Sequence, residues 1–179
     1  MKNICTIQEK DVYPDKKTEL VEYEDRLTVK AIVLDTEGRI GLVGNKQNSF
    51  LQLPGGGIDM GEDIKEGLKR ECLEEIGCLV EIISEIGYID DYRPRDKKHC
   101  INYCYVAKVM GEKGTPNYTE KETEIGMYTE WVSSQEAMNI FEKQKQDLEN
   151  GLVAFYNTGF NILRDYHFLK QANYEEKIK

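Results

Sequence analysis

The chain has 179 residues, which is enough for one domain with a sizeable core and too few for two full domains. Apolar residues make up 40% and charged residues 32%, a composition that is typical of globular proteins and excludes a disordered or fibrous chain. The 33 acidic and 24 basic residues give a net charge of −9, which argues against nucleic acid as the main partner because that partner requires a basic surface.

The N-terminal segment, residues 1–26, is interpreted as an extension that precedes a single domain at residues 27–179. It begins MKNICTIQEKDVYPDKK, which lacks the apolar core of a signal peptide. Nowhere does the chain approach the roughly 20 apolar residues of a membrane span. The 5 cysteines are an odd number without a C-x-x-C pair, so reduced thiols are expected. We therefore expect a cytoplasmic protein that does not bind membranes.

The first half of the domain is predicted to contain three strands and a helix. Residues 27–34, LTVKAIVL, are β-branched and apolar, and the turn DTEGR separates them from IGLVG, as in a β-hairpin. A third short strand, residues 50–53, ends at Pro54 and three glycines. The helix is predicted from about residue 63 to residue 76. It ends at Gly77, since many helices end at a left-handed glycine.

Further strands are predicted at residues 80–92 and 101–110, separated by RPRDKKH, the most basic stretch of the chain. Residues 111–126 are rich in Gly, Pro, Thr and Glu and are predicted to form a loop before a strand at residues 127–132. Cys100 and Cys104 could share a metal ion, but their spacing in a strand places both on one face. We favour two buried thiols.

Two helices are predicted after the last strand. Ser133 or Ser134 can cap the first, which continues through Phe141. The second is indicated by apolar residues that recur at three and four positions between Leu152 and Leu169. Its apolar stripe either completes the core, which we favour, or contacts a second copy of the chain in a homodimer.

An acidic helix follows the three glycines in residues 55–78, GGGIDMGEDIKEGLKRECLEEIGC. On a helix, Glu71, Glu74 and Glu75 share one sector because they lie at i, i+3 and i+4, so their carboxylates are predicted to converge. Like charges at this spacing destabilise a helix. Hard divalent cations such as Mg²⁺ bind carboxylate oxygens and link them to phosphates. We therefore predict a metal site at these acids that binds a phosphate ligand.

The residues around the acids allow functional and structural interpretations. Arg70 lies one turn before Glu74 and can hold a carboxylate in place. Glu62 near the helix start can act with it or can complement the helix dipole. Gly67 costs roughly 1 kcal/mol relative to alanine, so it either leaves space above the acids or is a tolerated surface residue. Residues 55–57 either let the backbone approach a ligand or form a turn.

The spacing from Gly56 is G-x5-E-x7-R-E-C-L-E-E-I-G-C, which resembles the Nudix box G-x5-E-x7-R-E-U-x-E-E-x-G-U, where U is a bulky aliphatic residue. The fixed positions that match are Gly56, Glu62, Arg70, Glu71, Glu74, Glu75 and Gly77. Cys72 and Cys78 replace the two aliphatic residues after the arginine. Cysteine is a small hydrophobe, so we expect looser packing there without loss of a charged position.

This resemblance to the Nudix hydrolases, the MutT-like nucleoside diphosphate-X pyrophosphohydrolases, implies an α/β/α sandwich around a mixed β-sheet. It implies that residues 27–179 are a single Nudix domain with C-terminal helices. The implied reaction is hydrolysis of the phosphoanhydride bond in a nucleoside diphosphate linked to another group, by water attack on phosphorus. The implied cofactor is Mg²⁺ or Mn²⁺, and the partner is a small nucleotide. The alternative is a non-catalytic module that binds a nucleotide or metabolite.

By position, the resemblance assigns a role to each motif residue. The metal ligands would be Glu71, Glu75 and the carbonyl of Gly56. Glu74 would be a third ligand or would help to remove a proton, and Arg70 and Glu62 would orient the carboxylates. The base in this family can also lie outside the box. The loop residues Glu122 and Glu124 are candidates, although solvated loop acids are the simpler interpretation.

Substrate choice depends on residues outside the box. Pro94 lies sixteen residues after Cys78, which resembles the branch of the family that hydrolyses ADP-ribose. The neighbouring cations, Arg93 and Arg95 among them, could bind a phosphate, and Tyr88 or Tyr92 could stack on a base. A solvated hairpin loop would have the same composition. The extension is shorter than the additional sheet domain of many ADP-ribose enzymes, so a nucleoside triphosphate, including an oxidised one, is an equal candidate.

Overall fold

Two long strands at the centre of the sheet pair antiparallel along their whole length, from Leu79 opposite Met110 to Arg93 opposite Lys98. The computed structural model describes residues 1–16, 21–47, 50–175 and 177–178, with Tyr174 described without its side chain. The strands are β1 Asn3–Ile7, β2 Glu24–Leu34, β3 Ile40–Asn45, β4 Leu51–Gln52, β5 Leu79–Arg93, β6 Lys98–Met110 and β7 Met127–Val132. They form one 7-stranded sheet in the order β1-β5-β6-β2-β3-β4, with β7 paired to β3.

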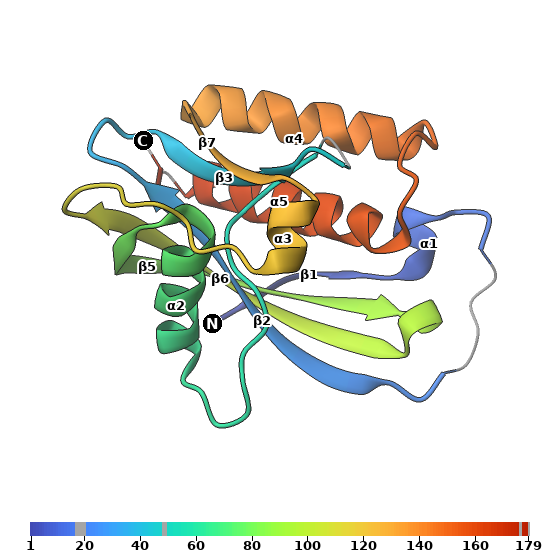
Figure 1. The fold of residues 1–179 in the computed structure, drawn as a ribbon. Helices are drawn as coiled ribbons and strands as arrows, with labels where there is room; N and C mark the ends of the chain where they lie inside the picture. The colour runs from blue at the N-terminus through green and yellow to red at the C-terminus, as the bar shows by residue number, and fades with distance from the viewer. Residues whose placement is uncertain (17–20, 48–49, 176, 179) are drawn as a thin grey trace.

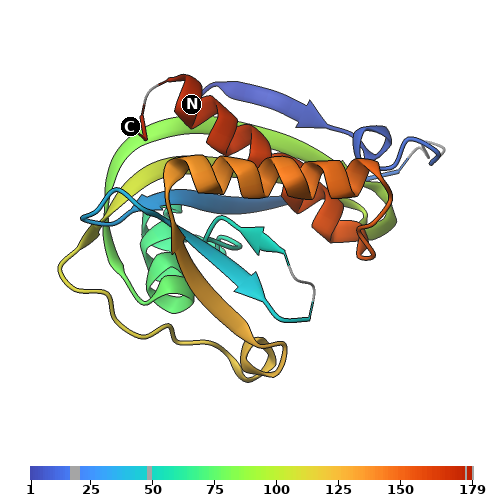
Figure 2. The same ribbon diagram turned by 90° about the horizontal axis from the view of Figure 1, so that it is seen from above.

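The sheet is mixed, and helices cover both of its faces (Figure 1). The helices are α1 Glu9–Val12, α2 Ile64–Ile76, the 3-10 turn η1 Pro94–Asp96, α3 Glu120–Glu124, α4 Ser134–Glu149 and α5 Tyr156–Tyr174. Strand β2 runs parallel to β6, and β1 runs parallel to β5, whereas the other pairs are antiparallel. Helix α2 lies on one face, and α4 and α5 lie on the other (Figure 2). The predicted α/β/α sandwich around a mixed sheet is confirmed.

The side chains of β2 alternate between two apolar clusters, because successive residues of a strand point to opposite faces. Val29, Ala31 and Val33 pack with α2 residues such as Leu68. Ile32 and Leu34 pack with residues of α4 and α5. A strand buried on both faces is expected to be continuously apolar, which explains the run that predicted it.

Helix α2 begins and ends close to its predicted bounds. The Asp63 carboxylate accepts hydrogen bonds from the backbone N–H groups of Lys65 and Glu66 at 2.9 and 3.3 Å. Gly77 ends the helix in the left-handed conformation, at φ 65°. A Cβ there would lie 2.7 Å from the carbonyl oxygen of Gly114, so only glycine allows the following loop to approach.

The segment 111–126 differs from the predicted loop because it contains helix α3. Thr119 caps the start of this helix, and its hydroxyl accepts a hydrogen bond from the Glu122 N–H. The Glu122 carboxylate accepts one in return from the Thr119 N–H at 2.8 Å. This reciprocal cap stabilises a turn that has no apolar periodicity.

The last helix begins at Tyr156, later than the periodic pattern indicated, and Leu152 and Phe155 lie before it and are exposed. Its apolar side chains, Phe160 and Phe168 among them, are fully buried, so the stripe completes the core. Strands at 27–34, 40–44 and 127–132 and the helix capped by Ser133 are confirmed within a few residues. Cys100 and Cys104 are free, buried thiols.

The N-terminal segment is part of the same sheet. Strand β1 pairs with β5, and the ring of Tyr13 stacks on that of Tyr156 with 5.3 Å between the centroids. Within the described residues, no helix is long and apolar enough to cross a membrane.

Candidate functional site

The glycine segment, residues 54–57, passes between β2 and α2. The N–H of Val29 donates to the Gly56 carbonyl, and that of Ala31 donates to Pro54, both at 3.0 Å. A Cβ on Gly55, whose φ is 128°, would lie 2.1 Å from the Val29 carbonyl oxygen. A Cβ on Gly56 would lie 2.6 Å from both carboxylate oxygens of Glu71. The absence of side chains at Gly55 and Gly56 therefore lets the backbone of this segment contact both β2 and α2. Atoms of the protein, not a ligand, occupy the space next to their α-carbons.

Glu75 is buried where α2 meets this segment. Its Oε2 accepts a hydrogen bond of 2.7 Å from the Gly55 N–H. Burial raises the pKa of Glu75 to about 7, although the charge of Lys30 and this hydrogen bond act to lower it. Lys30 is also buried, and its ammonium donates to the carbonyls of Leu53 and Gly55. A buried acid and a buried base thus hold the segment from opposite sides.

Arg70 connects the loop before α2 to the acids on the helix. Its Nε and Nη2 donate to the two carboxylate oxygens of Glu62 at 2.9 and 3.0 Å, and Nη2 also donates to the Gly57 carbonyl. Its Nη1 donates to Glu71 at 2.7 Å and to Glu74 at 3.2 Å. The hydrogen bonds from Arg70 lower the pKa of Glu62 to about 2. The guanidinium therefore fixes Glu71 and ties Glu62 to the helix.

The prediction that the carboxylates of Glu71, Glu74 and Glu75 converge at one metal site is wrong. Among the described residues, no three His, Cys, Asp or Glu side chains lie close enough to hold a metal ion. Glu71 and Glu75 both meet the glycine segment, whereas the Glu74 carboxylate bonds Arg70 and its side chain is 46% exposed. Arg70 precedes Glu74 by one helical turn, the spacing at which opposite charges pair, and its Nη1 binds the carboxylates of both Glu71 and Glu74.

Two carboxylates beside the glycine segment still match a hard cation. Mg²⁺ is typically held by one or two carboxylates together with substrate phosphates and water. Glu71, Glu75 and the Gly56 carbonyl supply only oxygen donors, and the bond from Val29 leaves that carbonyl a second lone pair. These residues could therefore hold a divalent cation, with Glu74 free to contribute from a more exposed position.

Gly67 does not leave space for a ligand. A Cβ there would lie 2.6 Å from Cδ1 of Ile58 and 2.9 Å from Oε2 of Glu62. Gly67 is itself buried, so it is not a tolerated surface residue either. Its missing side chain lets residues 58–62 pack on α2, and this contact brings Glu62 within reach of Arg70.

A polar cavity of about 220 Å³ lies on the opposite side of the glycine segment, against α5. Gly55 and Gly56 line it, together with polar side chains from β2, β5, β6 and α5. The principal ones are Arg26, Lys30, Arg93, Asn102, Asn161 and Arg164. We call it the α5 cavity. Sequence analysis missed Lys30 and Arg164, although a charged residue inside each apolar run is the signal that could have identified them.

The predicted substrate residues Arg93 and Arg95 separate in the structure. Arg93 lines the α5 cavity, and its Nε and Nη2 donate to the buried Asp91 carboxylate at 2.6 and 3.0 Å. The guanidinium of Arg95 instead lies over the ring of Tyr156, 5.1 Å from its centroid, and does not line the cavity. Tyr92 stacks on His99, with 4.3 Å between the ring centroids.

The loop acids lie apart from the α5 cavity. Glu122 caps α3, as described above. Glu124 borders a separate surface cavity with Lys46 and Gln47. Neither is hydrogen-bonded to the box residues within the part of the chain that the structure describes. Their role as a base stays a prediction.

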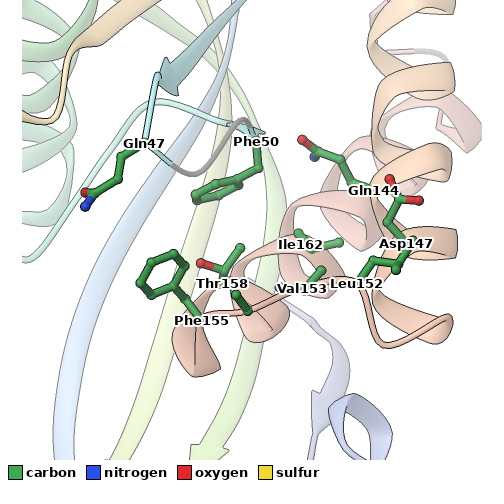
Figure 3. A pocket seen from close by; sticks show the side chains of 10 residues that line it. Gln47, Phe50, Gln144, Asp147, Leu152, Val153, Phe155, Thr158 and Ile162 are labelled. Carbon is green, nitrogen blue, oxygen red and sulfur yellow. The ribbon is translucent and has the colours of Figure 1, made fainter.

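A second, more apolar cavity of about 340 Å³ lies where α4 meets the start of α5. Figure 3 shows the rings of Phe50 and Phe155 on one side of it and the polar ends of Gln144 and Asp147 on the other. Thr158 and Ile162 of α5 lie between them. Its aromatic lining suits a flat apolar group.

Two curated proteins resemble part of this chain. An ADP-ribose pyrophosphatase of Methanocaldococcus jannaschii is 28% identical over 96 residues, which are 52% of this chain and 57% of that protein. A Bacillus subtilis protein, provisionally named as an 8-oxo-dGTP diphosphatase, is 37% identical over 68 residues, 38% of this chain and 46% of that protein. The chain thus spans about half the length of the curated relatives it matches.

Solved structures resemble it over more of its length. The crystal structure of a MutT protein from Methanosarcina mazei Go1 has a TM-score of 0.61 at 18% identity, and the match covers 88% of this chain and 99% of that chain. This likeness shows the fold. The model of the NUDIX domain matches residues 24–152, which is more than half of the chain and includes the whole of the box. The chain belongs to the NUDIX domain family.

Proposed function

We propose that the protein is a metal-dependent hydrolase that cleaves the phosphoanhydride bond of a nucleoside diphosphate linked to another group. The observation that carries the proposal is the pairing of Glu71 and Glu75 at the glycine segment inside an intact box. Arg70 holds Glu71 at 2.7 Å, and the Gly55 N–H holds Glu75 at 2.7 Å. A protein that only binds a ligand has no evident need to fix both acids.

The cation would be held by Glu71, Glu75 and the Gly56 carbonyl, and Mg²⁺ or Mn²⁺ suits these oxygen donors. When bound, a divalent cation neutralises phosphate oxygens and makes water a better nucleophile. Among the glutamates at the fixed positions of the box, Glu74 has the most exposed side chain and can accept the proton of the attacking water at its Oε atoms. Arg70 acts as a positioning residue because it touches the carboxylates.

The substrate we propose is an ADP-ribose-like compound or a nucleoside triphosphate. The names of the two curated relatives support both classes equally. The apolar cavity beside Phe50 and Phe155 offers a site for a base, since aromatic rings stack on bases. A binding module that does not turn over its ligand is the competing function.

The test is a panel of nucleotides assayed with Mg²⁺, in which released phosphate, pyrophosphate and nucleoside monophosphate are identified. We expect turnover of at least one compound by the wild type and a large loss with Glu75→Gln. The matched control is Glu66→Gln, which removes a carboxylate from an exposed position of the same helix. Tight binding of one compound without turnover of any would favour the binding module.

A further inference from the structure

The α5 cavity contains an unsatisfied donor. Arg164 is buried, with a side chain that is only 4% exposed, and it is one of the residues that line this cavity. Its Nε donates to Asp165 at 2.7 Å, and its Nη1 donates to Asn161 at 3.2 Å. Among the described side chains, its Nη2 is the one buried nitrogen or oxygen atom without a hydrogen-bond partner. Buried polar groups almost always have partners, so this donor requires an explanation.

The other buried polar side chains of the cavity wall are hydrogen-bonded. The amide of Asn102 donates to Asp91 at 2.9 Å and to the carbonyls of Ile89 and Cys100, and its oxygen accepts from Thr28 at 2.6 Å. Each nitrogen of the Arg93 guanidinium donates at least one hydrogen bond, to Asp91, Asn157 or Asn161. Because the neighbouring buried side chains are hydrogen-bonded, a packing defect is a poor explanation for the unpaired Nη2 of Arg164. A ligand that supplies acceptor atoms explains this unpaired donor.

Cations outnumber carboxylates around the cavity, although the protein is acidic overall. The cations that line it are Arg26, Lys30, Arg93 and Arg164. The carboxylates that neutralise them on this face are Asp91 and Asp165. Arg26 is exposed at the mouth, and its Nη2 would lie 3.3 Å from a Cβ at Gly57. It makes no hydrogen bond or ion pair with the residues that the structure describes.

The cavity also adjoins the proposed site of cleavage. Gly55 and Gly56 line it, and the same two residues contact Glu75 and Glu71 on the other side of the segment. Asp165 accepts a hydrogen bond of 3.0 Å from the Leu53 N–H, which ties the start of the segment to α5. A group bound in the cavity is therefore separated from the metal-binding acids by a single stretch of backbone.

We propose that the α5 cavity binds an oxyanion, a phosphate or a carboxylate, carried by the group that is linked to the nucleoside diphosphate. Arg164 Nη2 supplies the buried donor, and Arg26 supplies charge at the mouth. This inference rests on the proposed function for the identity of the substrate, and it narrows that substrate to compounds with an acidic group beyond the diphosphate. Guanidinium groups suit this task because their planar donors match oxyanions.

The first test is calorimetric titration of inorganic phosphate into the metal-free protein, where the carboxylates on α2 repel the anion. We expect phosphate to bind the wild type, and at least about tenfold weaker binding in Arg164→Gln, Arg164→Lys and Arg26→Gln. The Arg26 variant guards against misfolding of the buried ones, because Arg26 is exposed. Arg39→Gln, which removes an arginine outside the cavity, is expected to bind like the wild type. Unchanged affinity in the Arg164 and Arg26 variants would overturn the proposal.

A second titration distinguishes the sources of the oxyanion. UDP-glucuronate and UDP-glucose differ by a carboxylate on the linked sugar, whereas ADP-ribose 1″-phosphate and ADP-ribose differ by a phosphate on the linked ribose. We expect the more acidic member of at least one pair to bind about tenfold more tightly, and this preference to vanish in Arg164→Gln. Equal affinities within both pairs would overturn the assignment. The hydrolase could fail its own test while phosphate binding persists, and hydrolysis could persist with a cavity that binds no anion, so the two proposals fail separately.

Discussion

The backbone N–H of Gly55 donates a hydrogen bond of 2.7 Å to the carboxylate of Glu75. This contact joins the segment that follows β4 to the buried face of α2, so the loop and the helix of the box form one unit. The same carboxylate faces Lys30 across the segment, and the charge of Lys30 acts to lower its pKa while burial raises it. Changes at either end of the contact are expected to affect the site before they affect the rest of the fold.

Replacing Glu75 with glutamine is expected to lower kcat by about two orders of magnitude or more. The amide removes the negative charge that a divalent cation requires but keeps an oxygen that can accept from the Gly55 N–H. The free energy of unfolding should therefore change little. Steady-state kinetics and a urea titration check both parts, with Glu66→Gln as the control. Wild-type kcat in Glu75→Gln would contradict the assignment.

Replacing Arg70 with lysine is expected to weaken Mn²⁺ binding by about 10- to 100-fold. A lysine keeps the charge, but its single ammonium cannot bridge Glu62, Glu71, Glu74 and the Gly57 carbonyl as the guanidinium does. Electron paramagnetic resonance of free Mn²⁺ measures this affinity without an activity assay. A variant that binds Mn²⁺ like the wild type would show that Arg70 only stabilises the fold.

Replacing Gly55 with alanine is expected to lower the free energy of unfolding by about 3 kcal/mol or more. Its φ is 128°, and the added Cβ would lie 2.1 Å from the Val29 carbonyl oxygen. Gly38→Ala is the matched control because Gly38 also has a positive φ, 74°, but has no atom within 4 Å of the Cβ position. If both variants lose the same stability, backbone strain alone is responsible and the close approach to β2 contributes nothing.

Replacing Asp35 with asparagine is expected to destabilise the protein by about 1–3 kcal/mol at neutral pH. Burial of Asp35 alone would raise its pKa, but hydrogen bonds from Lys113 at 2.6 Å and from the N–H and side chain of Arg39 hold it below its usual range. A lowered folded-state pKa stabilises the protein above the unfolded value of about 3.9, and this stabilisation is lost as the pH falls below it.

The pH dependence separates this charge effect from simple loss of packing. Urea titrations at several pH values should show a constant difference between wild type and Asp35→Asn above about pH 5, and a shrinking difference below about pH 4. A difference that is independent of pH down to acid conditions would show that the pKa of Asp35 is not lowered by folding.

Much of the fold follows from local patterns in the sequence. The two-sided apolar run of β2, the turn before β3 and the cap and glycine at the ends of α2 each depend on neighbouring residues, so they could be predicted. Helix α3 could not, because it is held by the reciprocal cap of Thr119 and Glu122 and has no buried face. The pairing of β1 with β5 joins residues far apart in the chain, which no local pattern encodes.

In the site, too, some features follow from local sequence patterns and others depend on the folded chain. The spacing of Glu71, Glu74 and Glu75 predicted their shared sector, but it did not predict that Arg70 would bind Glu71 and Glu74 while Glu75 bonds the glycine segment. Lys30 and Arg164 come from β2 and α5, and only the folded sheet brings them to one cavity. In the sequence, Lys30 and Arg164 each stand as a charged residue within an apolar run. This pattern indicates a buried charge, but it does not identify the residue that pairs with that charge.

The most direct test of the account is the anomalous diffraction of Mn²⁺ in crystals of the protein soaked with that ion. We predict a peak next to the Gly56 carbonyl, with carboxylate oxygens of Glu71 and Glu75 at about 2.0–2.3 Å. A peak elsewhere, with these two side chains unchanged and without an ion between them, would contradict a metal-dependent site at the box.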